Sequence, residues 1–477
     1  MKKIMLLGAE AVPFASTGGL GDVMGSLPYA LKKHYGRRGD VRVVLPLYSK
    51  VGEAFRKKMT FVKAFTVSLA WRRQYCGVFE YRVHGVTYYF LDNEYYFDRD
   101  TLYGQFDDGE RYAFFCRAAL DLMHELDFFP DVLHANDWQS ALAVVYLRCK
   151  YGMDERYARI KTVFTIHNIE YQGIYDHGIL GDVFDLPPEA KDTVDFDGCI
   201  NLMKGAIVCC DKLTTVSPTY SKEIRYDYFG GRMADLIRQQ EGKLCGIVNG
   251  IDTEYYNPAK DKEIPFQFTA AELTGKREDK LELQRQFGLP EDPAVPVIAM
   301  VSRLASHKGF DLVACVLEEI LQWQVQFVLL GTGEDRFESY FKRLAAKYPS
   351  KAGVAITFNK GLAKLVYAGS DMFLMPSKSE PCGLSQMIAA TYGSVPIVHA
   401  VGGLADTIIP FNPESGEGNG VNFHSYNAHD MMDTVRRAVT LYYTDEDAWA
   451  RLQQNAMASD FTWNASAQGY ADVYDSL

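Results

Sequence analysis

The hydrophobic positions of this chain fall mainly in short, β-branched runs that alternate with stretches of helical spacing. This alternation is typical of βαβ units and parallel sheets. In the first half of the chain it predicts buried strands at residues 4–7, 41–47, 132–134, 162–166, 212–216 and 245–248. Helices are expected between them, for example at residues 22–34, 110–126 and 140–151. Two further runs, at residues 61–69 and 79–91, predict an inserted antiparallel pair of strands.

A second series of buried runs begins after a polar, charged stretch at residues 270–296. Its predicted strands lie at residues 297–301, 325–330, 354–358, 372–375 and 396–398. Such a restart predicts an α/β protein with two Rossmann-like, parallel-sheet domains in tandem. From residue 428 onward the spacing predicts three helical segments, the last one marked by aromatic residues.

The two series share a glycine-rich turn. Residues 17–22 (TGGLGD) follow the first strand of the first series, and residues 401–406 (VGGLAD) follow the last strand of the second. Paired glycines between a strand and a helix allow backbone N–H groups to approach a ligand closely. Two unrelated tight turns would give the same six-residue match, so the repeat supports a duplication only together with other signals.

The loop at residues 376–384 places a carboxylate between a buried strand and a helix that stops at Gly393. In an open α/β sheet, ligands bind outside the carboxyl ends of the strands. The N–H groups that open the helix suit an anion, and Glu380 can accept hydrogen bonds from hydroxyls. A nucleotide sugar has both features. The alternative is that Glu380 is a solvated acid in a turn shaped by Pro381 and Gly383.

Charged and polar residues also follow other predicted strands. Arg303 and Lys308 come after the strand at residues 297–301, and this pair of cations suits a diphosphate leaving group. His167 and Asp137 follow two strands of the first series, where side chains can reach sugar hydroxyls and a reacting centre. The alternatives are solvated basic residues and a structural histidine. The D-x-D sequence at residues 195–197 is only a minor candidate for metal binding, because no predicted strand precedes it.

Composition excludes several classes of protein. The chain has 477 residues, 48% of them hydrophobic, and a formal net charge of −11. That charge argues against nucleic acid or an anionic membrane as the main partner. Nine cysteines without a C-x-x-C pair match neither a disulfide framework nor a zinc site, and we expect reduced thiols and a cytoplasmic protein. No apolar run is long enough to span a membrane, and Glu10 interrupts the first one too early for a signal peptide.

Together these motifs resemble those of the bacterial glycogen synthases and plant starch synthases that use ADP-glucose. The resemblance spans nearly the whole chain, through STGGLGDV, HANDW, TIHNIEYQG, VSPTY, VNGID, VSRLASHKG, SEPCGL and VGGLADT. It implies the GT-B fold, with two Rossmann-like domains facing across a cleft. We expect an acceptor-side domain at residues 1–249, joined by a last helix within 461–477, and a nucleotide-sugar-binding domain at residues 250–460.

The resemblance also implies an activity, namely transfer of glucose from ADP-glucose to the non-reducing end of an α-1,4-glucan with retention of configuration. Glu380 would bind glucose hydroxyls, Arg303 and Lys308 would hold the diphosphate, and His167 would lie beside the anomeric carbon. Asp137 and Tyr103 would orient sugar and acceptor. The remaining donor contacts implied are Thr17, Gly18, Gly19, Asn249, Phe358 (stacked on adenine), Cys382, Gly383 and Leu384. No cofactor or metal is then required, and glycogen or starch is the expected partner.

The chain departs from the family pattern at a few positions. Ser16 stands where the family's glycine loop has a lysine, Ser379 replaces an aromatic residue, and residues 399–401 (HAV) lack the usual basic residue and threonine. The missing lysine favours one alternative, a weakly active or non-catalytic glucan-binding paralogue. A second alternative is a GT-B transferase that uses UDP-glucose.

Overall fold

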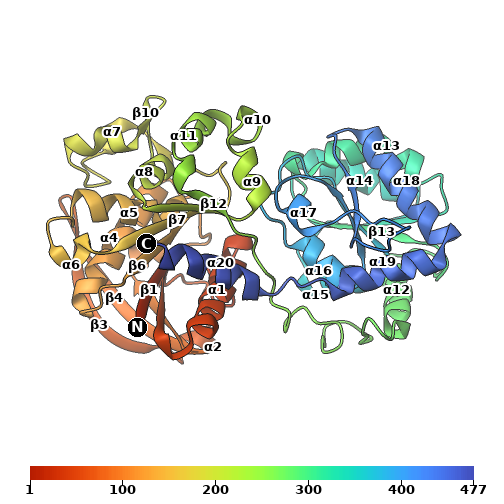
Figure 1. Cartoon of the computed structure of the whole chain (residues 1–477), viewed down its shortest axis with the longest axis horizontal. Coiled ribbons are helices and arrows are strands. Elements are labelled where there is room, and N and C mark those ends of the chain that lie inside the picture. Colours follow the sequence, from red (N-terminus) through yellow and green to blue (C-terminus); the bar gives the residue numbers. More distant parts are fainter. The chain divides into compact units, whose positions relative to one another are not determined.

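The computed structural model describes residues 1–477, which form two compact units. Unit 1 comprises residues 1–249 and 463–477, and unit 2 comprises residues 250–462. In Figure 1 the C-terminal helix of the chain is coloured blue and lies within the unit that also contains the red N-terminus. No helix is both long and apolar enough to cross a membrane.

Unit 1 is built on a nine-stranded sheet with the order β12-β11-β7-β6-β1-β2-β5-β4-β3. Its strands are β1 (Lys2–Leu7), β2 (Gly39–Pro46), β3 (Thr60–Leu69), β4 (Arg72–Val83), β5 (Val86–Asp92), β6 (Val132–Asn136), β7 (Lys161–Ile166), β11 (Lys212–Thr215) and β12 (Leu244–Gly246). The neighbours from β12 to β2 are parallel, as the β-branched runs predict. Strand β5 is also parallel to β2, which differs from the antiparallel pair predicted there, and β4 and β3 extend the sheet antiparallel. A small separate sheet contains β8 (Ile174–Tyr175), β9 (Asp195–Phe196) and β10 (Cys199–Asn201).

The prediction of one strand at residues 79–91 was wrong, because the chain turns back inside it. His84 and Gly85 both have positive φ, at 51° and 76°, and form a two-residue hairpin loop between β4 and β5. Two central residues with positive φ give a turn whose twist matches that of antiparallel strands. The insertion therefore contains three strands instead of two.

Helices follow most strands of unit 1. They are α1 (Gly19–Tyr35), α2 (Glu53–Arg56), α3 (Glu94–Phe97), α4 (Asp108–Glu125), α5 (Trp138–Cys149), α6 (Glu155–Ala158), α7 (Lys191–Val194), α8 (Leu202–Cys209), α9 (Pro218–Glu223), α10 (Asp227–Gly230), α11 (Ala234–Gln239) and α20 (Trp463–Asp475). The last of these packs beside α1 and is fixed by polar contacts. Lys2 Nζ donates to the Tyr474 carbonyl at 2.6 Å, and the Tyr474 hydroxyl lies 2.7 Å from Nδ1 of His134. The aromatic residues of the tail thus complete the core of unit 1.

Unit 2 contains a six-stranded, fully parallel sheet with the order β15-β14-β13-β16-β17-β18. Its strands are β13 (Val297–Val301), β14 (Gln326–Leu330), β15 (Ala352–Ala355), β16 (Met372–Met375), β17 (Val395–His399) and β18 (Val421–Phe423). Two predictions need correction. The third strand ends at Ala355, so Phe358 lies in a loop, and β18 follows the second glycine pair, which therefore comes after the penultimate strand.

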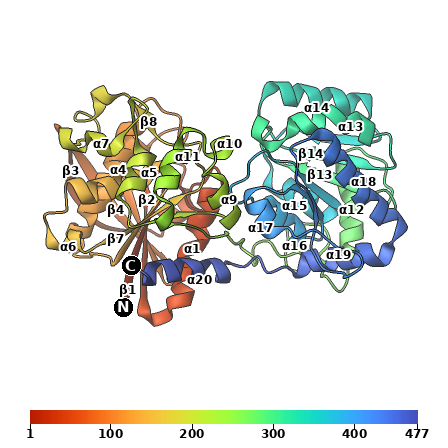
Figure 2. The same cartoon turned by 45° about the horizontal axis from the view of Figure 1, so that its top comes forward.

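The helices of unit 2 are α12 (Thr274–Gln286), α13 (Phe310–Ile320), α14 (Asp335–Lys347), α15 (Lys360–Gly369), α16 (Ser385–Thr391), α17 (Gly402–Thr407), α18 (Ala428–Thr444) and α19 (Glu446–Ala458). Alternate strand residues such as Ile298, Met300 and Phe327 share one core cluster with α13, α14 and α18. Helices α12 and α15 pack together elsewhere on the unit (Figure 2). The sheet is thus buried on both faces, as its near-continuous apolar strands require.

At the amino-end edges of both sheets, an aspartate stands directly before a strand and accepts a backbone N–H of the neighbouring strand. Asp131 precedes β6 and accepts the N–H of Lys3 at 2.7 Å, and Asp211 precedes β11 and accepts the N–H of Thr162 at 2.7 Å. In unit 2, Asp371 precedes β16 and accepts the N–H of Val297 at 2.7 Å. Each carboxylate supplies a hydrogen-bond partner for the N–H of the first or second residue of the neighbouring strand.

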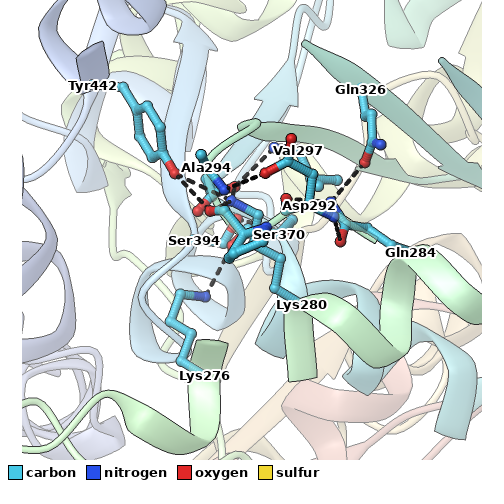
Figure 3. Close-up of polar contacts among 12 residues, drawn as sticks. Lys276, Lys280, Gln284, Asp292, Ala294, Val297, Gln326, Ser370, Ser394 and Tyr442 are labelled. Carbon is cyan, nitrogen blue, oxygen red and sulfur yellow. Dashed lines mark hydrogen bonds and ion pairs between the residues drawn. The ribbon is translucent and has the colours of Figure 1, made fainter. Parts of the chain in front are cut away.

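In unit 2 this edge carries a larger buried polar network (Figure 3). Lys280 reaches from α12 to Asp371, with its Nζ 2.8 Å from Oδ2. Lys276, one turn earlier, donates to the carbonyls of Ala368, Ser370 and Tyr392 at 2.7, 2.9 and 2.9 Å. These contacts attach α12 to the sheet by hydrogen bonds that replace the hydration of two buried ammonium groups.

Candidate active site

In unit 1, the polar residues at the carboxyl ends of β6 and β7 lie against each other. The Asp137 carboxylate accepts a hydrogen bond from the backbone N–H of His167 at 2.8 Å. Asp137 has φ +57° and ψ 178°, a conformation that costs free energy for any residue with a Cβ. Backbone strain of this kind is concentrated at functional sites, so the HANDW turn is a candidate on geometry as well as on sequence.

The electrostatics of Asp137 are equally unusual. The residue is only 9% exposed, and burial raises the pKa of its carboxyl to about 7 against the opposing hydrogen bonds from the His167 and Asn168 N–H groups. The negative charge of Glu10 raises this pKa further. Asp137 therefore changes its charge near neutral pH, whereas an exposed aspartate is ionised throughout that range.

His167 is held as a neutral imidazole. Burial lowers its pKa to about 3, and its Nε2 lies 2.9 Å from the Asn136 side-chain oxygen. The Asn136 amide nitrogen donates to the Leu7 carbonyl at 3.1 Å, which orients the amide oxygen toward the ring. His167 therefore donates through Nε2–H and keeps Nδ1 unprotonated. Asn136 was not among the predicted site residues, although it stands in the same motif.

Glu10 is a second residue that the sequence reasoning missed. Its buried carboxylate receives the backbone N–H of Thr17, the Thr17 hydroxyl at 3.0 Å and the N–H of Gly18 at 3.3 Å. It also accepts the Tyr103 hydroxyl at 2.6 Å. An acid shortly after the first buried strand was the available signal. Because this carboxylate already occupies two N–H groups of the glycine loop, the N–H groups open to a ligand begin at Gly19.

The first glycine loop has little room beneath Ser16. A Cβ added at Gly21 would lie 2.1 Å from the Ser16 Oγ, and that hydroxyl donates to the Gly18 carbonyl at 3.3 Å. The pair of small residues allows the loop to fold closely onto the first turn of α1. No cation occupies this position, as the sequence indicates.

In unit 2, the loops after β13 and β16 bring two predicted residues together. Lys308 Nζ lies 2.6 Å from Oε2 of Glu380, and the Ser377 hydroxyl donates to the same oxygen at 3.0 Å. Gly309 has φ +78°, and a Cβ there would lie 2.0 Å from the Pro376 carbonyl oxygen. Only glycine permits this approach of the two loops, so it positions Lys308 against Glu380.

Arg303 and Phe358 have different surroundings. The Arg303 side chain is exposed and makes no hydrogen bond or ion pair. Phe358 follows β15 and is 83% exposed, which is unusual for a phenylalanine. Arg303 and Phe358 thus lie on loops that follow strands of the same parallel sheet. These loops are at the carboxyl ends of the strands, where such sheets bind ligands.

The second glycine pair, Gly402 and Gly403, packs against the backbone of the Glu380 loop. The N–H of Gly403 donates to the carbonyls of Glu380 and Pro381, both at 3.1 Å. A Cβ at Gly402 would lie 2.0 Å from the Glu380 carbonyl oxygen, and one at Gly403 would lie 2.1 Å from that of Cys382. These glycines therefore permit loop packing, a role that differs from the open N–H cradle suggested by their likeness to the first pair.

Comparisons with known proteins agree with these motifs. A family model described as the starch synthase catalytic domain matches residues 3–239, and one described as glycosyl transferases group 1 matches residues 279–457. The glycogen synthase of Ligilactobacillus salivarius is 48% identical over 477 residues, with all of both chains covered. That of Geobacillus thermodenitrificans is 48% identical over 478 residues, covering 100% of this chain and 98% of the relative. The chain belongs to the glycogen and starch synthase family.

Solved structures place this family member in the GT-B fold. The catalytic domain of starch synthase IV from Arabidopsis thaliana, bound to ADP and acarbose, superposes with a TM-score of 0.90 at 31% identity, covering 100% of this chain and 99% of that one. Sucrose-phosphate synthase from Thermosynechococcus elongatus shares the fold, with a TM-score of 0.62 at 16% identity and coverage of 100% and 99%. The expected fold class is therefore confirmed.

The remaining predicted residues have the following surroundings in this synthase-family chain. Asn249 is buried at the end of unit 1, and its side-chain oxygen has no hydrogen-bond partner. Cys382 is buried, Gly383 has φ +71°, and Leu384 is the N-cap of α16.

The D-x-D sequence is engaged in other contacts. Asp195 Oδ1 lies 2.6 Å from His177 Nε2, and Asp197 forms an ion pair with Arg232 at 3.1 Å. No group of three or more histidine, cysteine, aspartate or glutamate residues gathers where a metal ion could be held. The two acids therefore serve local contacts.

Proposed function

We propose that this protein transfers glucose from ADP-glucose to the 4-hydroxyl at the non-reducing end of an α-1,4-glucan, with retention of configuration. The full-length similarity to glycogen synthases supports the class of reaction. The observation that carries the proposal at the level of residues is the Lys308–Glu380 pair, with the unpartnered Arg303 on the same loop as Lys308. It combines an acceptor for sugar hydroxyls with two cations for a diphosphate.

Unit 2 would bind the donor. Arg303 offers a planar fork to phosphate oxygens and Lys308 a compact charge, so together they stabilise the negative charge that develops on departing ADP. Glu380 would accept hydrogen bonds from glucose hydroxyls, and N–H groups near Gly383 and Leu384 would assist. The exposed ring of Phe358 would stack on adenine.

Unit 1 would supply the groups around the anomeric carbon and the acceptor. Neutral His167 presents either its unprotonated Nδ1 or its backbone carbonyl to an oxocarbenium-like centre, and it adds no positive charge there. Asp137 would orient sugar hydroxyls, and Tyr103, held by Glu10, would contact the acceptor. The remaining proposed donor contacts are Asn249 and the first glycine loop, where Gly19 offers an open N–H group and Thr17 and Gly18, whose N–H groups donate to Glu10, would shape the loop around the donor.

Retention of configuration needs a base on the face from which ADP departs. The C1–O bond to ADP breaks, the acceptor O4 bonds to C1 from the same face, and the acceptor proton passes to the departing β-phosphate. No carboxylate stands out as a covalent nucleophile, because Glu380 is already paired with Lys308 and Asp137 is held by backbone N–H groups. The two cations of unit 2 supply the charge that stabilises the leaving group.

The test is transfer of labelled glucose onto glycogen from ADP-glucose, with UDP-glucose in parallel. We expect transfer from ADP-glucose by the wild type and its collapse in Glu380→Ala. Glu414→Ala, which removes an exposed acid elsewhere in unit 2, serves as the matched control and should retain activity. Preference for UDP-glucose would contradict the donor assignment.

One observation favours a second candidate, a glucan-binding paralogue with little catalysis. Ser16 removes the cation that the family usually places in the first glycine loop. This candidate predicts retardation of the protein on a glycogen-containing gel without transfer from either donor. Restored transfer in Ser16→Lys would locate the defect in that loop.

A further inference from the structure

We propose that His399 is a positioning residue for Glu380, acting through the backbone of Ser377. The inference rests on the proposed function, in which Glu380 binds the transferred glucose. His399 is the last residue of β17 and one of the positions at which this chain departs from the family pattern. The role proposed for His399 therefore concerns a feature of this chain that the family pattern does not include.

Each ring nitrogen of His399 faces a backbone carbonyl oxygen, and one face of the ring stacks on an aromatic side chain. Nδ1 lies 2.7 Å from the Ser377 carbonyl oxygen, and Nε2 lies 3.3 Å from that of His424. The ring stacks on Phe423 with centroids 5.1 Å apart and an interplanar angle of 24°. At 4% exposure, the ring cannot exchange these contacts for water.

The contact continues from His399 to the carboxylate. The carbonyl of the Ser377–Lys378 peptide is held by His399, and its N–H, on Lys378, donates to the His307 carbonyl at 2.8 Å. The plane of this peptide is thus fixed from both sides. The hydroxyl of Ser377 then donates to Oε2 of Glu380, the oxygen that also contacts Lys308.

The protonation of His399 follows from its acceptors. Carbonyl oxygens only accept hydrogen bonds, so each ring nitrogen that faces one must carry a proton to bond it. Burial lowers the pKa of His399, which leaves the ring with one N–H near neutral pH. The shorter contact, at 2.7 Å, assigns that N–H to Nδ1 and hence to Ser377.

Two conservative variants separate the ring nitrogens. The amide of asparagine can replace Nδ1–H, and the longer glutamine can replace Nε2. His399→Asn thus keeps the Ser377 contact, and His399→Gln keeps only the one to His424. We expect kcat for transfer from ADP-glucose to fall less than about threefold in the first and at least about tenfold in the second. Their melting temperatures should agree, because each variant leaves one carbonyl unpaired.

A double-mutant cycle tests the route through Ser377. In a Ser377→Ala background the hydroxyl link to Glu380 is gone, so His399→Asn and His399→Gln should have equal kcat. Equal kcat for the two variants in the wild-type background would overturn the proposal. A rate difference that persists with Ser377→Ala would also overturn it, since His399 would then act by another route.

Binding measurements keep this test independent of turnover. The ratio of the ADP Kd to the ADP-glucose Kd reports the contribution of glucose contacts, and it should fall in His399→Gln and persist in His399→Asn. A wild type that binds ADP-glucose without transferring glucose would refute the proposed function while leaving His399 testable by this ratio. A wild type that does not bind ADP-glucose would overturn both.

Discussion

The parallel sheet of unit 2 has two edges with opposite uses of polar residues. At the amino-end edge, Lys276 and Lys280 are buried, and their ammonium groups contact backbone carbonyls, Tyr442 and Asp371. Figure 3 shows both lysines with Ser370 and Tyr442. At the carboxyl-end edge, Arg303 has no partner and Phe358 is bare. The first edge uses its polar groups to hold the fold together, and the second leaves groups available to a ligand.

Unit 1 repeats this difference. Asp131 and Asp211 accept the N–H of the second residue of neighbouring strands at the amino-end edge. At the other edge Asp137 is strained, buried and has a raised pKa, and Glu10 organises the glycine loop. Position relative to a parallel strand therefore predicts whether a charged residue is structural, and the following variants test that rule.

The largest expected effect is on transfer by Lys308→Met. Removal of this cation leaves the Glu380 carboxylate buried without its ion pair and takes a positive charge from the leaving group. We expect kcat to fall about 10³-fold in the glucose-transfer assay. Lys342→Met, an exposed lysine of α14, is the control. A decrease in kcat of less than about tenfold would indicate that Lys308 has a structural role, like Lys276 and Lys280.

Asp137 should contribute a strong pH dependence of stability. Its folded pKa is about 7, above the ordinary value of 3.8, so the folded state retains a proton that the unfolded state releases between these values. Stability from neutral Asp137 is therefore complete below pH 3.8 and lost as pH rises through 7, by up to about 4 kcal/mol. Melting temperatures of wild type and Asp137→Asn across pH 4–8 measure this loss as a difference. Parallel pH profiles would contradict it.

Lys276→Met should affect stability and spare chemistry. The change strands three buried carbonyls and should lower the free energy of unfolding by about 3 kcal/mol or more. Calorimetry of the variant measures the effect, and kcat per folded molecule should change less than about twofold. Lys347→Met, at an exposed ion pair, is the matched control. A loss of kcat without a loss of stability would contradict the structural role assigned to the amino-end edge.

Ser16→Lys should give the smallest effect, a gain in donor affinity. One charge-assisted contact to phosphate contributes about 1.5 kcal/mol, which corresponds to roughly a tenfold lower Kd for ADP-glucose. Ser16→Gln, long but uncharged, should not reproduce it. Calorimetric titration distinguishes the two, and an unchanged Kd in Ser16→Lys would show that the loop N–H groups suffice.

Most of the architecture was predictable from local pattern. The period of apolar residues indicated both series of parallel strands, and the three helical segments of the tail appear as α18, α19 and α20. The break at His84–Gly85 was missed because an apolar run continues across it, although the X-Gly pair was a usable turn signal. Short β18 has too few residues for any period to show.

The amino-acid sequence by itself determined the fold class, the family and the loops that carry the candidate site, because strand period and motif spacing are local properties. Only the tertiary structure decided how those loops are held. The contacts of Glu10 with Tyr103, Lys308 with Glu380 and His399 with Ser377 join residues 22 to 93 positions apart. Which buried acid meets which donor depends on strand order and loop packing, and both arise only when the sheets assemble.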